Sequence, residues 1–339
     1  MRQTRVIIAH NSVDDDADIS TADVLEQVAL VELGLKELGV EYDVVAVEGH
    51  RVWQAIQPRE DTVVFNLVEA PPGAPQLQPA SAAVLELLGM PFTGSRSAAL
   101  WLTTDKLATR AVLASNGLAV APGGRIWSDN AEILDVVPPP WIIKPGWEDA
   151  SVGLDGSPVC SGREQALERT RELERRFAGQ PLVLEHFLPG REFNVALLDN
   201  GRGPQVLPVA EMEFFDYPPD VPPLVTYEGK WIVGSFDDEH TQRHFPADEV
   251  DGPLLADVRN LARRAWKVCG LEGYGRVDIR ADERGRPCIL EVNANPCLSE
   301  EAGFVIAAAH AGLTPGSLVG RIIRAALRPQ PQPDATVPA

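Results

Sequence analysis

Two stretches near the C-terminal end decide the fold: Gly275-Arg276-Val277-Asp278 and Leu290-Glu291-Val292-Asn293-Ala294-Asn295-Pro296. Each pattern predicts a β-strand in which a carboxylate stands where apolar alternation expects a buried or cleft-facing residue. Two carboxylates and an amide at the ends of adjacent strands form a cluster of hard oxygens. Such a cluster suits Mg²⁺, with substrate phosphates completing its octahedron. The residues alone leave a second interpretation open, in which a core carboxylate pairs with Arg276.

Upstream, a lysine ends another predicted strand, Trp141–Lys144, and the loop 145–156 that follows contains glycine and serine. Such a loop offers one ammonium and several backbone N–H groups to a phosphate chain. The loop is neither GxxxxGK[ST] nor GxGxxG, so taken alone it is equally well an ordinary turn.

Further along, Glu185, Phe187 and Glu192 give a carboxylate at a strand end, an aromatic ring and a second carboxylate. This order suits a purine base and a ribose hydroxyl. A strand-to-strand corner with solvated charges is the simpler interpretation of this pattern alone.

The N-terminal part of the chain alternates short apolar strands with helices, which predicts an α/β fold with a parallel, doubly wound sheet. Ligand loops in such sheets follow the carboxyl ends of strands, here after His10 and Leu67. The remaining elements predicted are strands at 182–185, 192–198, 205–209, 274–280 and 287–292, and helices at 104–115, 164–177, 248–269, 300–311 and 316–327. The second group of strands is expected to form an antiparallel sheet, and residues 216–246 an irregular functional loop.

The composition excludes several classes of partner. Thirty Lys and Arg against 49 Asp and Glu give a formal charge of −19, and about half of the imbalance lies in residues 1–100, with 15 acidic and 6 basic residues. An anionic chain repels nucleic acid and anionic membranes, so neither is an expected partner. No apolar run approaches the ~20 residues that span a bilayer, no signal-peptide pattern opens the chain, and the four cysteines lack CxxC spacing. These features predict a cytoplasmic protein.

Taken together, the motifs indicate a protein family. Their order resembles the ATP-grasp superfamily and, within it, the D-alanine–D-alanine ligases, over nearly the whole chain up to about residue 327. The matching segments are Thr104-Asp105-Lys106, Ile143-Lys144-Pro145, Ala150-Ser151-Val152-Gly153, Leu184-Glu185-His186-Phe187-Leu188, Gly190-Arg191-Glu192, Tyr227-Glu228-Gly229-Lys230 and the two stretches quoted first. The resemblance implies an N-terminal substrate domain (1–100), a central lid domain (101–189) and a C-terminal metal-binding domain (190–327). The Pro- and Gln-rich composition of residues 328–339 predicts a disordered tail.

By this resemblance, ATP lies between the central and C-terminal domains. Lys106, Lys144 and Lys230 are expected at its phosphates. The loop Asp149–Gly153, with Ser151 as a catalytic candidate and Gly153 as a binding one, is expected to close over the γ-phosphate.

The remaining nucleotide contacts also come from the resemblance. Adenine is expected beside Glu185 and the main chain at Phe187 and Leu188, and the ribose hydroxyls beside Glu192. Two Mg²⁺ ions, or Mn²⁺, are expected on Asp278, Glu291 and Asn293. Arg276 is expected to stabilise the acyl phosphate and the tetrahedral species.

The implied reaction is ATP-dependent formation of an amide between an amino acid or small-peptide carboxylate and an amine. Two alternatives remain: an authentic D-alanine–D-alanine ligase of cell-wall synthesis, and a non-catalytic ATP-binding sensor or partner protein. The resemblance also implies a homodimer.

The departures from the family pattern lie on the amino-acid side of the cleft. Ala150 and Trp231 stand where the family has a serine and a tyrosine that fasten a loop over the substrate, and Ala302 stands near a substrate-binding serine. Cys297 replaces a glycine and is interpreted as a small apolar filler. These changes put D-alanine itself in doubt. The family's His-Gly strand end is also missing, and Phe65-Asn66-Leu67-Val68-Glu69 occupies its place. Glu69 and Asp18 of the acidic run 14–18 are candidates for binding an ammonium group; a solvated acidic loop explains that run equally well.

Overall fold

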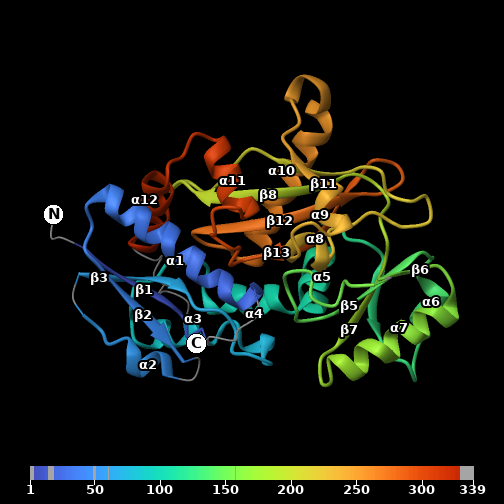
Figure 1. Cartoon of the computed structure of the whole chain (residues 1–339), viewed down its shortest axis with the longest axis horizontal. Helices are drawn as coiled ribbons and strands as arrows, with labels where there is room; N and C mark the ends of the chain where they lie inside the picture. The colour runs from blue at the N-terminus through green and yellow to red at the C-terminus, as the bar shows by residue number, and fades with distance from the viewer. Residues whose placement is uncertain (1–3, 14–18, 49–50, 60, 157, 329–339) are drawn as a thin grey trace, which may run out of the picture.

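The computed structural model describes residues 4–13, 19–48, 51–59, 61–156 and 158–328. Three β-sheets organise this part of the chain, with orders β2-β1-β3, β4-β7-β5-β6 and β11-β10-β8-β12-β13, and β9 adds to β8. Figure 1 shows the first sheet in blue at one end of the molecule, the second in green at the other, and β12 and β13 in orange between them.

The first sheet is parallel and covered on both faces, which confirms the predicted doubly wound α/β arrangement. Its strands are β1 (Arg5–Asn11), β2 (Tyr42–Val47) and β3 (Thr62–Leu67). Val6 and Ile8 of β1 pack with α1 (Ile19–Leu38) and α12 (Pro315–Ala326), whereas Ile7 and Ala9 pack toward α2 (Val52–Ala55) and α3 (Ala80–Leu87). Successive side chains of a strand point to opposite faces, so one apolar run serves both layers.

The second sheet is antiparallel and has a separate hydrophobic core. It contains β4 (Gly123–Ile126), β5 (Trp141–Pro145), β6 (Val159–Cys160) and β7 (Leu182–His186), and α6 (Ile133–Val136) and α7 (Arg163–Arg176) belong to the same unit. The sequence did not predict β4. A Cβ at Gly123 would lie 2.2 Å from the Leu184 carbonyl oxygen, so β4 pairs closely with β7 only because this residue has no side chain.

Two consecutive helices connect the first two sheets. α4 (Ser97–Thr104) ends at Asp105, and α5 (Lys106–Ser115) begins directly afterwards. The Asp105 carboxylate accepts the Ala108 N–H at 2.9 Å and thereby caps α5, so this helix starts two residues later than predicted.

The third sheet carries the residues quoted first in the sequence, on strands β8 (Glu192–Asp199), β9 (Pro204–Val206), β10 (Ala210–Phe214), β11 (Thr241–His244), β12 (Tyr274–Ala281) and β13 (Pro287–Asn293). Val277 and Ile279 pack in one core with α10 (Asp248–Cys269). The alternate residues Arg276, Asp278 and Arg280 therefore project from the opposite face. The antiparallel arrangement is confirmed, but the strand predicted at 205–209 ends at Val206, and residues 207–209, which have no regular structure, separate β9 from β10.

The prediction of an irregular segment at 216–246 is also wrong. It contains α8 (Tyr227–Trp231), α9 (Phe236–Glu239) and the edge strand β11. The Tyr217 hydroxyl donates to Asp237 at 3.0 Å and lies 3.2 Å from the Thr241 hydroxyl. These contacts join residues that are about 20 positions apart and order the segment. The local sequence pattern does not predict them.

The predicted domain boundaries at residues 100 and 189 stay a prediction, because one core cluster includes Ile7, Leu113 and Trp266 from across both boundaries. Of the predicted tail, residues 329–339 lie outside the described residues, and Arg328 pairs with Asp199 at 2.8 Å. Within the described chain no single helix combines the length and apolarity needed to cross a membrane, although α11 (Gly303–His310) and α12, bent by 108° at their junction, pass that test together.

Candidate active site

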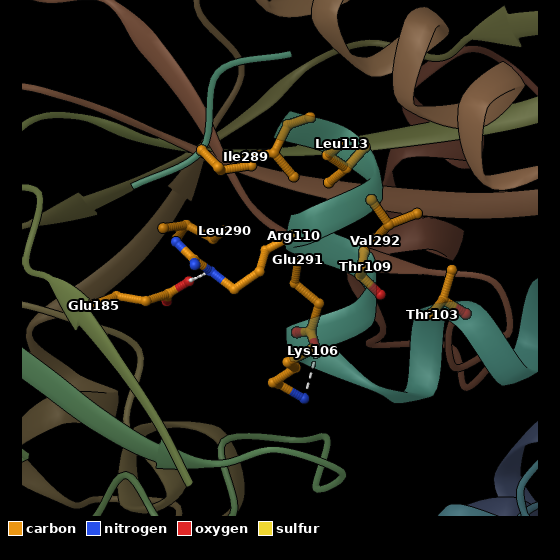
Figure 2. Close-up of a pocket in the computed structure, with 11 residues that line it drawn as sticks. Thr103, Lys106, Thr109, Arg110, Leu113, Glu185, Ile289, Leu290, Glu291 and Val292 are labelled. Carbon is orange, nitrogen blue, oxygen red and sulfur yellow. Dashed lines mark hydrogen bonds and ion pairs between the residues drawn. The ribbon is translucent and has the colours of Figure 1, made fainter. Parts of the chain in front are cut away.

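The two carboxylates that open the sequence argument stand directly opposite each other. Asp278 on β12 pairs with Glu291 on β13, and Arg276 pairs with Asn293. Directly opposite residues of an antiparallel pair project from the same face, so these four side chains share one surface of the sheet. The first turn of α5 and the strand β7 approach this surface (Figure 2).

Lys106, in the first turn of α5, reaches Glu291. Its ammonium lies 2.9 Å from Glu291 Oε1 and 3.2 Å from Asp149 Oδ1, and it also donates to the Glu148 carbonyl. Burial alone would lower the pKa of Lys106, but Glu291 and Asp149 outweigh it and hold that pKa above its ordinary value, so the ammonium is charged.

Asp149 and Glu291 share this lysine unequally. The pKa of Asp149 is raised to about 6 by partial desolvation among its neighbours and by the charge of Glu291, against the opposing effect of Lys106, although about half of its side chain is exposed. The pKa of Glu291 lies below its ordinary value, because Lys106 and Lys144 outweigh its burial. A proton held by this pair therefore resides on Asp149. The sequence predicted Glu291 as a ligand but placed Asp149 only within the phosphate loop.

Lys144 ends β5 beside Glu185 of β7. The charged groups of Lys144 and Glu185 are 2.7 Å apart. Arg110 lies 3.3 Å from the other Glu185 oxygen, as Figure 2 shows. Burial raises the pKa of Glu185, but the two cations outweigh it, so the carboxylate stays ionised. The sequence did not single out Arg110. Its spacing of four from Lys106 on a predicted helix, which places both on one face, was the available signal.

Glu192 is buried and pairs with a residue that the sequence analysis missed. The Arg280 guanidinium lies 3.1 Å from the Glu192 carboxylate, and its centre lies 4.7 Å from the centroid of the Phe187 ring. Burial raises the pKa of Glu192, with Arg280 opposing. The predicted base and ribose residues, Phe187 and Glu192, are thus brought together by Arg280; Leu188 is buried beside them in the chain.

Arg276 and Asp278 form a bidentate pair. The Nε and Nη2 atoms of Arg276 lie 2.8 and 2.9 Å from the two Asp278 oxygens, and the Asn194 amide donates to Oδ1 at 2.9 Å. The Asn293 side-chain oxygen accepts the Asn295 N–H at 2.8 Å, which orients this amide in the turn after β13.

These side chains fit a magnesium site. Asp278, Glu291 and Asn293 present carboxylate and amide oxygens on one face, and Glu291 Oε1 is a buried atom with no hydrogen bond among the described residues, although Lys106 lies beside it. Two carboxylates with an amide match the donor set that Mg²⁺ takes when phosphates supply the remaining oxygens. Within the described chain no group of three or more His, Cys, Asp or Glu residues forms a metal cluster by itself.

The loop Asp149–Gly153 is hydrogen-bonded to α8 and to the segment that precedes it. The Ser151 hydroxyl donates to the Val225 carbonyl at 2.9 Å, and the Trp231 indole N–H donates to the Ala150 carbonyl at 3.3 Å. Ala150 and Ser151 have φ of 56° and 62°, so the loop turns through left-handed backbone here. Ala150 stands at the position of the family's serine and has no hydroxyl to bond a side chain. Trp231 instead bonds the backbone carbonyl of Ala150.

Gly153 closes this loop for a steric reason. Its φ is +81°, and a Cβ there would lie 2.7 Å from the Pro145 ring, so only glycine is compatible with this packing. The carbonyl of Gly153 accepts from Arg169 at 2.6 Å, which fixes the loop against α7.

Lys230, on α8, faces the same charged surface. Its side chain is exposed, and its ammonium is close enough to Arg276, Glu291 and Asp278 to interact with their charges. Among the described residues no carboxylate lies within ion-pair distance of its ammonium. The structure therefore brings all three predicted phosphate lysines toward one cleft from three different elements.

The amino-acid side of the cleft collects Glu69, Gln27, Asp23 and Cys297. The Gln27 amide lies 3.4 Å from both the Glu69 and the Asp23 carboxylates, and the Cys297 thiol donates to Asp23 at 2.8 Å. The interpretation of Cys297 as an apolar filler is therefore wrong, because its sulfur bonds a carboxylate. Asp23 was missed by the sequence analysis, and Asp18, with the rest of the acidic run 14–18, lies outside the described residues.

Fold and site together define a protein of the ATP-grasp class. A family model described as "D-ala D-ala ligase C-terminus" matches residues 125–324. The chain belongs to this D-alanine–D-alanine ligase family, whose activity is that of a ligase.

Individual relatives agree with this assignment. The chain is 31% identical to "Uncharacterized protein y4sG" of Sinorhizobium fredii over 80% of this chain and 76% of the relative. It is 35% identical to a D-alanine–D-alanine ligase of Bordetella pertussis over 70% and 71%. Two crystal structures of the Bacillus anthracis D-alanine–D-alanine ligase, one of them complexed with ATP, share the fold with TM-scores of 0.75 and 0.72 at 18% and 17% identity, and each comparison covers 96% of this chain and 97% of theirs.

Proposed function

We propose that this protein joins an amino acid or small-peptide carboxylate to an amine, with ATP as the activating substrate and an acyl phosphate as the intermediate. The observation that carries the proposal is a set of buried or half-buried ion pairs in one cleft. They are Lys106–Glu291, Lys144–Glu185, Arg276–Asp278 and Arg280–Glu192. They supply the fixed cations that a triphosphate needs and the carboxylates that its metal ions, base and ribose need.

The chemistry requires this concentration of charge. The substrate carboxylate attacks the γ-phosphorus, the bond to the bridging oxygen breaks, and ADP leaves. The amine nitrogen then attacks the acyl carbon, phosphate leaves, and the nitrogen loses a proton to give the amide. Because two anions approach each other in the first step, Lys106, Lys144 and Lys230 stabilise the negative charge that gathers around the γ-phosphate, and Arg276 that of the acyl phosphate.

Asp278, Glu291 and Asn293 would hold Mg²⁺, as two ions, or Mn²⁺. The metal, when bound, neutralises phosphate charge and fixes the orientation of the triphosphate. Lys106 and Arg276 at present pair with Glu291 and Asp278, so metal and nucleotide binding would exchange these ion pairs for contacts to phosphate.

The loop that holds Ser151 and Gly153 would act as the lid. An acyl phosphate is hydrolysed by water, so a closed lid protects it until the amine attacks. The contacts Ser151–Val225 and Trp231–Ala150 are what fasten this loop in the structure.

The amine-side substrate is proposed to bring a cationic group to Glu69. Its carboxylate is half-buried, lies near Asp23 and has the Gln27 amide as a weak donor at 3.4 Å. An ammonium would compensate both carboxylates. Asp18 remains a proposal for the same role.

Release of phosphate from Mg-ATP across a panel of free amino acids and dipeptides, D-alanine included, tests the function. Asp278→Asn should abolish any turnover, whereas Arg263→Met, an exposed change on α10, should leave it intact. A clear preference for D-alanine would establish the authentic D-alanine–D-alanine ligase that the relatives' names suggest. ATP binding without ADP formation under every mixture would refute the ligase and favour a nucleotide sensor.

The proposal also covers the cellular location and the oligomeric state of the protein. A cytoplasmic setting agrees with the four free thiols of the described chain. A homodimer is proposed from the family resemblance, and light scattering on the purified protein tests it.

A further inference from the structure

Arg243 is a half-buried cation that the mechanism above does not use. It lies on the edge strand β11 opposite Met212, which lies opposite Glu192, which in turn lies opposite Arg280. Residues directly opposite one another share a face of the sheet, so Arg243 projects from the face that carries the active-site residues.

Arg243 has no partner among the described residues. Its Nε atom is buried without a hydrogen bond, and no carboxylate lies within ion-pair distance of its guanidinium. Burial lowers the pKa of Arg243, the nearby Arg276 lowers it further, and the charge of Glu301 opposes both only from a distance. Arg276 has Asp278 as its counter-charge, whereas Arg243 has no carboxylate within ion-pair distance among the described residues, so the positive charge of Arg243 stays uncompensated.

The surroundings of Arg243 add further positive potential. A Cβ at Gly303 would lie 3.4 Å from Arg243 Nη2, so the guanidinium rests against the first residue of α11. The free N–H groups of a helix start carry partial positive charge, and Ala302 before it offers no side-chain oxygen. Arg243, Arg276 and the start of α11 therefore surround a position that favours an anion.

This position belongs to the amino-acid side of the cleft. The segment before α11 carries Cys297, bonded to Asp23, and Leu298, whose N–H donates to Gln27 at 3.1 Å.

We propose that Arg243, together with Arg276, binds a carboxylate of the amine-donating substrate, which makes Arg243 a specificity-determining residue. This inference rests on the proposed ligase function. A guanidinium fork recognises a carboxylate by two parallel hydrogen bonds, and Asp278 occupies only the Nε and Nη2 donors of Arg276. With Glu69 and Asp23 for an ammonium, the cleft would then match both ends of a free amino acid or peptide.

The test compares Arg243→Met, Arg243→Lys and the control Arg263→Met. An amino acid that supports phosphate release is kept at constant concentration as the carboxylate substrate, and the amine substrate is supplied either as the free acid or as its carboxamide. The wild type and Arg263→Met should favour the free acid by about 10- to 100-fold in KM, the range expected for hydrogen bonds to a charged group. Arg243→Met should remove most of this discrimination, and Arg243→Lys should restore part of it. Unchanged discrimination in Arg243→Met overturns the inference.

A binding measurement separates this inference from the ligase proposal. If no amino acid supports phosphate release, the Tm of each variant is measured in sodium acetate and in sodium chloride at equal ionic strength. Acetate should raise the Tm of wild type and Arg263→Met above its value in chloride, and Arg243→Met should lose this difference. Without acetate, Arg243→Met should melt at or above the wild-type temperature, because it removes an unpaired half-buried charge. A lower Tm for that variant, or an acetate effect that survives the substitution, overturns the inference.

Discussion

Glu69→Gln is expected to stabilise the protein increasingly as the pH rises. Burial raises the pKa of Glu69 from 4.5 to about 7; the Gln27 amide opposes this, and Asp23 adds to it. A carboxyl whose pKa is higher in the folded state contributes stability that is complete below pH 4.5 and is lost as the pH rises through 7. With 1.36 kcal/mol for each unit of pKa, the ionised carboxylate costs about 3 kcal/mol at pH 8 and about 1.4 kcal/mol at pH 5.5.

Urea unfolding of wild type and Glu69→Gln at pH 5.5 and pH 8 measures this difference. The stability advantage of the variant should grow by about 2 kcal/mol between the two pH values. Glu26→Gln is the matched control, since Glu26 is exposed on α1 and its advantage should not change in this way. A constant advantage of Glu69→Gln across the range would refute the reasoning, because it would show that Glu69 keeps one charge state throughout.

The same experiment bears on the substrate. An ammonium bound beside Glu69 favours the ionised carboxylate, so amine binding should strengthen as the pH rises through 7, as long as the amine itself stays protonated. In Glu69→Gln this pH dependence should disappear.

Three further changes probe separate parts of the molecule. Lys144→Met should lower phosphate release by on the order of 10²- to 10³-fold, because a charge fixed beside Glu185 is lost; steady-state kinetics with ATP titration checks this. Trp231→Phe removes the N–H that holds the Ala150 carbonyl and should lower kcat about 5-fold while ATP hydrolysis without amide formation rises; unaltered partitioning between the two products would contradict the assigned lid contact. Gly123→Ala should destabilise by about 1–3 kcal/mol or more in thermal unfolding, because its Cβ meets the Leu184 carbonyl oxygen, whereas Gly162→Ala has open space and should be tolerated.

Much of the fold followed from local patterns. The apolar runs of β1 and β3 predicted a parallel sheet covered on both faces, and the alternation around Asp278 and Glu291 predicted two strands with carboxylates on one face. What local pattern missed was β4 and the ordered segment between β10 and α10. Gly123 is a poor strand former by itself, and the order around Tyr217 comes from partners about 20 residues away.

The candidate site divides in the same way. Lysines and carboxylates at strand ends were visible in the sequence, since charge in an apolar run is unusual. Arg110, Arg280 and Arg243 were not, because an arginine on a helix or strand is ordinarily a solvated surface residue. Only burial and the identity of its neighbour give each of them meaning.

The sequence by itself determined the class of protein, because the order and spacing of the short motifs can be recognised without knowing which residues are in contact. It also determined which residue types could meet phosphate and metal. Only the tertiary structure decided which charges are paired: Lys106 with Glu291, Arg276 with Asp278, and Arg243 with no residue in the described part of the chain. The physical reason is that the interaction energy of a charged group depends on its burial and on its distance to residues far apart in the chain. Neither quantity can be obtained from the local sequence.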